Sequence, residues 1–245
     1  MITEIIKPGD KVEIKNLQQA QKGETGQPDN SLHKSQVLDL TENGNIVISM
    51  PIENGQLVLL ALGARLELNF YSKGGLYRAI GQVRERYKQD NVYMLVLELK
   101  SQLEKFQRRE YYRFPCVLDI DYYLLAEEDL QYETAENIYV KLRQEEEKGK
   151  EYAGQILDLS GGGIKFRTAE KVEADQLLLL RMYLKSERID KQYYILGRVV
   201  ACGRSEKGNG RFYEVRVKFL IQDDKVREEI IRYIFEEERR LRQKD

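Results

Sequence analysis

Short strand-like segments separated by turn residues run through the first part of the chain. Apolar and polar residues alternate most clearly in residues 64–70, ARLELNF, and turn-forming pairs such as Asn54-Gly55 and Gly74-Gly75 interrupt the pattern. Strands of this length and spacing, with no helical periodicity between them, are typical of a small antiparallel barrel. We therefore expect a β-barrel over residues 1–100, with a long polar hairpin loop at 18–31. Its first strand is expected within residues 8–17, after a turn, with Val12 and Ile14 on one face. The others are expected at residues 35–40, 45–49, 56–60, 64–71, 77–87 and 92–99.

The second half of the chain repeats this kind of pattern and then changes to a helical one. Val226, Ile230, Tyr233 and Ile234 recur at helical spacing, so a C-terminal helix is predicted over residues 223–243. The predicted fold class is all-β, with two small antiparallel β-barrels and a C-terminal α-helix. Strands of the second barrel are expected at residues 116–125, 152–159, 163–168, 176–184, 193–202 and 211–221.

An acidic segment, residues 126–151, interrupts the second barrel. It holds nine acidic and four basic side chains, and residues 135–147 within it have the spacing of a surface helix, with Ile138 and Leu142 one turn apart. We interpret the segment as an insertion that is either a solvated surface or a surface for a protein partner.

Composition excludes several classes of function. With 40 basic and 41 acidic residues the net charge is -1, so the chain lacks the basic bias of a general nucleic-acid binder. One histidine, His33, is expected in the polar loop region, and two cysteines, Cys116 and Cys202, are expected as reduced, half-buried thiols, so N/S ligands for zinc are too few. No apolar run is long enough for a membrane span, and the first residues lack a signal-peptide pattern. We expect a cytoplasmic protein.

An arginine-rich segment, QRREYYRF at residues 107–114, is the strongest candidate for a binding site. Arg108, Arg109 and Arg113 place three guanidinium groups within six residues, with Tyr111 and Tyr112 between the second and third. The guanidinium is charged at any working pH and its planar fork suits phosphate oxygens, the O6/N7 edge of guanine and stacking on a base. Of the two tyrosines, one is expected in the core and one at the ligand or domain interface, and the sequence does not say which.

A glycine-rich turn follows 45 residues after Arg113, and it contains Asp158, Ser160 and Gly163. Asp, Ser and Gly are common turn residues, so this motif alone indicates a structural β-turn, just as the arginine segment alone indicates a solvated basic turn. No helical pattern follows the glycines, which excludes the usual phosphate site at a helix N-terminus.

Together, the two motifs resemble those of the PilZ-domain family, receptors for the bacterial second messenger cyclic di-GMP. The string QRREYYRFP and the length of chain before it are similar to the two-domain flagellar-brake type of that family. The resemblance implies an N-terminal domain over residues 1–100, a connector over 101–107 and a PilZ domain over 108–245. It also implies a binding protein with no catalytic activity and no cofactor, whose ligand is cyclic di-GMP.

The resemblance also assigns roles to individual residues. Arg109 and Arg113 would grip phosphate and the guanine edge, and Arg108 would stack on a base and favour a stacked pair of ligands. Asp158 would accept hydrogen bonds from guanine N1–H and N2–H₂ and so select the base. Ser160 would donate to phosphate or pin the turn, and Gly163 would let the backbone approach the ligand.

Three hypotheses for function follow. The first is a ligand-gated adaptor that changes its interdomain arrangement on binding cyclic di-GMP and regulates a partner, which the resemblance places in the flagellar motor or in a polysaccharide synthase. The second is an RNA-binding barrel protein, which the near-zero net charge disfavours. The third is a phosphodiesterase, for which the sequence offers no His/Asp cluster.

Overall fold

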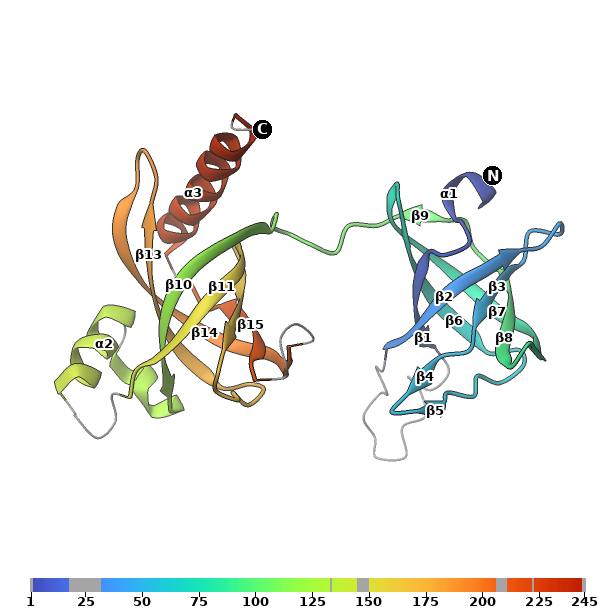
Figure 1. Cartoon of the computed structure of the whole chain (residues 1–245), viewed down its shortest axis with the longest axis horizontal. Coiled ribbons are helices and arrows are strands. Elements are labelled where there is room, and N and C mark those ends of the chain that lie inside the picture. The colour runs from blue at the N-terminus through green and yellow to red at the C-terminus, as the bar shows by residue number, and fades with distance from the viewer. Residues whose placement is uncertain are drawn as a thin grey trace. The chain divides into compact units, whose positions relative to one another are not determined.

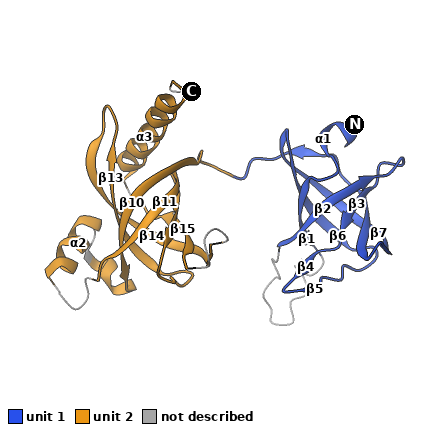
Figure 2. Ribbon diagram, in the orientation of Figure 1, with its two compact units in different colours: residues 1–108 blue, residues 109–245 orange. Residues whose placement is uncertain are grey.

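The computed structural model describes residues 2–17, 32–132, 134–144, 150–205, 211–221 and 223–243. The chain forms two compact units, Met1–Arg108 and Arg109–Asp245 (Figure 2). The predicted hairpin loop at 18–31 lies outside the described residues.

The first unit is an antiparallel β-barrel, because the pairing of β6 with β7 closes the sheet order β6-β1-β2-β3-β8-β7 (Figure 1). Alternation in the sequence sets the inward face: Leu66, Leu68 and Phe70 of β6 are fully buried in one apolar core. The elements of this unit are α1 (Ile2–Ile5), β1 (Lys11–Asn16), β2 (Leu32–Leu40), β3 (Ile46–Ser49), β4 (Ile52–Glu53), β5 (Gln56–Leu57), β6 (Arg65–Ser72), β7 (Gly75–Gln89), β8 (Val92–Leu99) and β9 (Glu104–Lys105).

The segment predicted as a connector, residues 101–107, is partly a strand of the first barrel. Its strand β9 pairs with β7 through Arg78 opposite Glu104 and Tyr77 opposite Lys105. Phe106 extends the attachment, since its backbone N–H donates to the Leu76 carbonyl oxygen at 2.8 Å. The pattern in the sequence missed this strand because two residues are too few to show alternation.

His33 does not lie in a solvated loop, as its polar surroundings suggested, but in strand β2. Its side chain is buried, and its Nδ1 lies 2.7 Å from Glu53 Oε1 of β4. Because the partner is 20 residues away, the neighbouring residues in the sequence gave no sign of this contact.

The second unit is also a closed antiparallel barrel, with the strand order β10-β11-β12-β15-β14-β13 (Figure 1). Its core contains Ile120, Phe166, Leu180 and Val215, together with Ile230 from the C-terminal helix. Both predicted barrels are thus confirmed. The elements are β10 (Phe114–Leu125), a 3₁₀ helix (Glu127–Tyr132), α2 (Ala135–Gln144), β11 (Tyr152–Ser160), β12 (Gly163–Thr168), β13 (Leu177–Lys185), β14 (Asp190–Arg204), β15 (Tyr213–Phe219) and α3 (Asp224–Arg242).

The acidic insertion is anchored to the barrel by one face of α2. Ile138 and Leu142 are buried in a small apolar cluster with Tyr123 and Leu179 of the barrel wall. Residues 133 and 145–149 of the insertion lie outside the described residues, so the predicted helix 135–147 is observed as far as Gln144.

The C-terminal helix α3 is present as predicted. Asp223 caps it, because its side chain accepts a hydrogen bond from the Lys225 backbone N–H, and the carboxylate also favours the positive end of the helix dipole. Tyr233 and Ile234 pack into the core. Among the helices of the described residues, none is long and apolar enough to cross a membrane.

Candidate ligand-binding site

The pairing of β10 with β11 brings the arginine-rich segment beside the glycine-rich turn. Phe114 lies opposite Leu159 and Pro115 lies opposite Asp158, so Arg113 directly precedes the first paired residue. Proline has no N–H to give to the strand ladder, and the register shifts after Pro115. Two motifs that are 45 residues apart in sequence are therefore neighbours at one end of the barrel.

Ser160 pins the glycine turn. The strand β11 ends at Ser160 and β12 begins at Gly163, and the Ser160 hydroxyl donates to the Gly163 carbonyl oxygen at 2.9 Å. Ser160 is buried, with 8% of its surface exposed. Of the two roles open for this residue, the structure shows the one in which the hydroxyl holds the turn.

Gly163 is required by strand packing. A Cβ atom at this position would lie 2.1 Å from the Val217 carbonyl oxygen of β15, a backbone atom that cannot move aside. With any other residue at position 163, β12 and β15 could not pair as closely. Strand packing therefore explains this glycine without a ligand, and close approach of a ligand to its backbone stays a prediction.

Tyr111 covers the same turn and joins it to α3. A Cβ on Gly161 or Gly162 would come within 2.8 Å or 2.9 Å of the Tyr111 ring, so the ring lies directly against both glycines. Arg227 of α3 donates from Nη1 to the Tyr111 hydroxyl at 2.7 Å, and its Cζ lies 5.6 Å from the ring centroid. Tyr111 is thus the inward-facing tyrosine of the pair.

Tyr112 is the outward-facing one, because it is 52% exposed and its hydroxyl donates to Glu238 of α3 at 3.3 Å. Arg227 is a residue of the site that the sequence did not reveal. It sits in the first part of a charged helix, where one arginine does not stand out, and its partner is 116 residues away.

The arginines of the cluster fall on both sides of the boundary between the units. Arg109 and Arg113 are exposed residues of the second unit. Arg108 is the last residue of the first unit, and its Nη1 donates to Glu13 Oε2 at 2.8 Å. Arg113 therefore precedes the strand paired with Asp158, and Arg109 lies two residues before Tyr111, which packs on the glycine turn. The Arg108 side chain lies on the first barrel.

Asp158 is half-buried and lies close to Cys116. Burial raises the pKa of the neighbouring Cys116 thiol to about 12, and the negative charge of Asp158 adds to the shift. Cys116 therefore stays a neutral thiol beside the carboxylate, and both Cys116 and Cys202 are free and half-buried, as expected.

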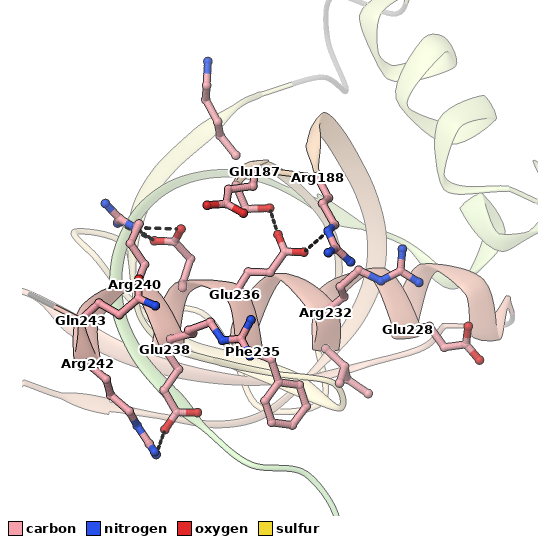
Figure 3. Close-up of a pocket in the computed structure, with 15 residues that line it drawn as sticks. Glu187, Arg188, Glu228, Arg232, Phe235, Glu236, Glu238, Arg240, Arg242 and Gln243 are labelled. Atoms are coloured by element: carbon pink, nitrogen blue, oxygen red, sulfur yellow. Dashed lines mark hydrogen bonds and ion pairs between the residues drawn. The ribbon is translucent and has the colours of Figure 1, made fainter.

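A groove of about 1350 Å³ runs along the outer face of α3 (Figure 3). It contains ion pairs and hydrogen bonds of its own, such as Ser186 Oγ donating to Glu236 Oε2 at 2.6 Å. Its lining residue Ile231 also borders the glycine turn, since a Cβ on Gly161 would lie 2.9 Å from Ile231. The groove is lined by Lys185, Ser186, Glu187, Arg188, Glu228, Ile231, Arg232, Phe235, Glu236, Glu237, Glu238, Arg239, Arg240, Arg242 and Gln243.

The protein is therefore built from two barrels. One end of the second carries a candidate site for an anion and a nucleobase, made of exposed arginine, an aspartate and a glycine turn. A PilZ-domain family model matches residues 107–236, and a model described as flagellar protein YcgR matches residues 7–99. The chain belongs to the PilZ-domain family and has the two-domain arrangement of YcgR.

Solved structures show the same fold. The inhibitor of motility MotI/DgrA of Bacillus subtilis matches with a TM-score of 0.68 and 19% identity, over 98% of this chain and 100% of that one. YcgR of Escherichia coli in complex with c-di-GMP matches with a TM-score of 0.51 and 14% identity, over 96% of this chain and 87% of that one. No match was found among curated protein sequences.

Replacing Gly163 should test the packing argument. Gly163→Ala forces a Cβ against the Val217 carbonyl oxygen, and overpacking of this kind costs about 1–3 kcal/mol or more of unfolding free energy. Gly203→Ala is the matched control, because its Cβ would meet no atom within 4 Å. Urea unfolding should show a lower midpoint for Gly163→Ala only, and equal midpoints in the two variants would contradict the assignment.

Proposed function

We propose that this protein is a non-catalytic receptor for cyclic di-GMP that regulates motility. The observation that carries the proposal is the pairing of β10 with β11, which sets Pro115 opposite Asp158 and so brings the end of the arginine-rich segment beside that carboxylate. This set of groups matches the ligand, which presents two phosphates and two guanines. The complex of YcgR with c-di-GMP, which shares the fold, adds support.

Arg109 and Arg113 supply the positive charge. Both are exposed residues, so a ligand in solvent can reach them, and the guanidinium fork suits phosphate oxygens or a guanine edge. No other residue type offers two parallel N–H donors at fixed charge, which is why a lysine at either position would bind less well.

Asp158 supplies base selection. Its carboxylate can only accept hydrogen bonds. Phosphate oxygens have no hydrogen to donate to it, whereas guanine presents the donors N1–H and N2–H₂ along one edge. The carboxylate lies on β11 directly opposite Pro115, so the strand pairing holds it close to the arginine-rich segment.

Regulation of motility is supported by the two-domain similarity. MotI/DgrA is described as an inhibitor of motility and corresponds to this chain over nearly its whole length, and the family model for the first barrel is described as a flagellar protein. We infer a component of the flagellar motor as the protein partner, a cytoplasmic location, and a ligand-dependent change in the arrangement of the two units, through the differential contacts that any such shift requires.

Removing either arginine should weaken binding. Arg109→Ala and Arg113→Ala each lose charge-assisted hydrogen bonds worth roughly 1.5–3 kcal/mol, so the dissociation constant for cyclic di-GMP should rise about 10- to 150-fold in calorimetric titration. Arg143→Ala is the control. Arg143 is an exposed arginine of the same unit, but it belongs to α2, which lies near the end of β10 opposite to Arg113 (Figure 1). Binding as in the wild type by either site variant would refute the site.

Replacing Asp158 by Asn should relax base selection. The amide keeps one acceptor oxygen where the carboxylate has two, so Asp158→Asn should bind cyclic di-GMP more weakly and discriminate less against cyclic di-AMP. The ratio of the two dissociation constants is the readout. If that ratio equals the wild-type value, Asp158 is a turn residue only.

Overproduction should slow swimming in a flagellated bacterial host that makes cyclic di-GMP. The wild-type chain should reduce the diameter of swimming halos, whereas Arg109→Ala, which loses the ligand, should not. Equal inhibition by both would show that the effect on motility does not depend on the ligand site.

A further inference from the structure

Arg108 is fastened to the outer wall of the first barrel. Its Nη1 donates to Glu13 Oε2 at 2.8 Å, its Nη2 donates to the Tyr71 hydroxyl, and its Cζ lies 5.4 Å from the centroid of the Tyr71 ring. A hydrogen-bonded ion pair and a cation–π contact therefore act on one guanidinium group, and all the partners belong to the first unit.

Strand register builds the receptor for this side chain. On the paired strands β1 and β6, Glu13 lies opposite Asn69 and Lys11 lies opposite Tyr71, so Glu13 and Tyr71 are diagonal neighbours. The alternate residues Val12 and Phe70 are buried in the core, so Glu13 and Tyr71 stand on the outer face. Burial and the nearby Glu13 carboxylate raise the pKa of Tyr71, which keeps its hydroxyl protonated.

The backbone leading to Arg108 is held as well. Strand β9 pairs with β7, the Phe106 N–H donates to Leu76, and the Arg78 guanidinium lies 4.7 Å from the Phe106 ring centroid. The Glu13 carboxylate has only 18% of its side chain exposed, so the ion pair with Arg108 is screened less than a fully exposed one. Breaking the ion pair between Arg108 and Glu13 therefore costs free energy.

We propose that Glu13 and Tyr71 are positioning residues that withhold Arg108 from the ligand, so that the first barrel competes with cyclic di-GMP for the third guanidinium of the cluster. This rests on the proposed function and extends it. Arg109, one peptide bond away, is outside the first unit. A ligand gripped by Arg109 and Arg113 can use the Arg108 nitrogens that bind Glu13 and Tyr71 only if those hydrogen bonds break. The observed affinity for cyclic di-GMP is then the intrinsic affinity multiplied by the fraction of molecules in which Arg108 has left Glu13.

Removing the Glu13 charge should release Arg108 and tighten binding. In calorimetric titration of the full chain with cyclic di-GMP, Glu13→Gln should lower the dissociation constant about 3- to 10-fold. Glu98→Gln is the matched control, because Glu98 also pairs with an arginine, Arg84, on the same barrel. The gain should vanish when Glu13→Gln is combined with Arg108→Ala, since the double variant has no guanidinium to release.

Unchanged or weaker binding by Glu13→Gln overturns the proposal, and so does a gain that persists in the Arg108→Ala background. Hydrogen exchange without ligand gives an independent readout: amides of residues 104–108 should exchange faster in Glu13→Gln than in Glu98→Gln, and equal rates overturn the proposal. Failure of the proposed function looks different. In that case the wild-type chain binds no cyclic di-GMP, while the exchange comparison still reports whether Glu13 holds Arg108.

Discussion

The antiparallel pairing of β10 with β11 is the constraint on which the candidate site depends. It places Pro115 opposite Asp158, and so brings a basic segment and an acidic side chain from distant parts of the chain to one end of a barrel. Tyr111 then fills the space above Gly161 and Gly162, where no side chain would fit. Since Arg227 of α3 holds that ring, the strands, the turn and the helix support one another at this end.

The boundary between the two units falls inside the arginine cluster, so its members differ in their surroundings. Arg109 and Arg113 are exposed on the second unit, whereas Arg108 is bound to Glu13 and Tyr71 of the first. In the proposed receptor, the bound anion would therefore meet arginines in two different states. A contact between Arg108 and the proposed ligand requires the ion pair with Glu13 to break.

Much of the fold could be predicted because it depends on local patterns. Alternation in β6 and the periodicity of α3 are properties of neighbouring residues, and the two barrels and the final helix followed from them. Both motifs of the site were also visible, since each is contiguous in sequence. The partners of those motifs were not, because Arg227 meets Tyr111 across 116 residues and Glu13 meets Arg108 across 95. The sequence singled out Gly163 for close approach of a ligand, whereas the structure shows that a side chain there would clash with Val217. That clash depends on the packing of distant strands, which no local pattern encodes.

A crystal structure of the chain with cyclic di-GMP bound tests the account most directly. The account predicts phosphate and guanine contacts from Arg109 and Arg113, a guanine edge on the Asp158 carboxylate, Tyr111 still packed on the glycine turn, and the Arg108–Glu13 ion pair broken. A ligand seated instead in the groove along α3, among residues such as Arg232 and Phe235, would contradict it, and so would a ligand that leaves Asp158 without a contact.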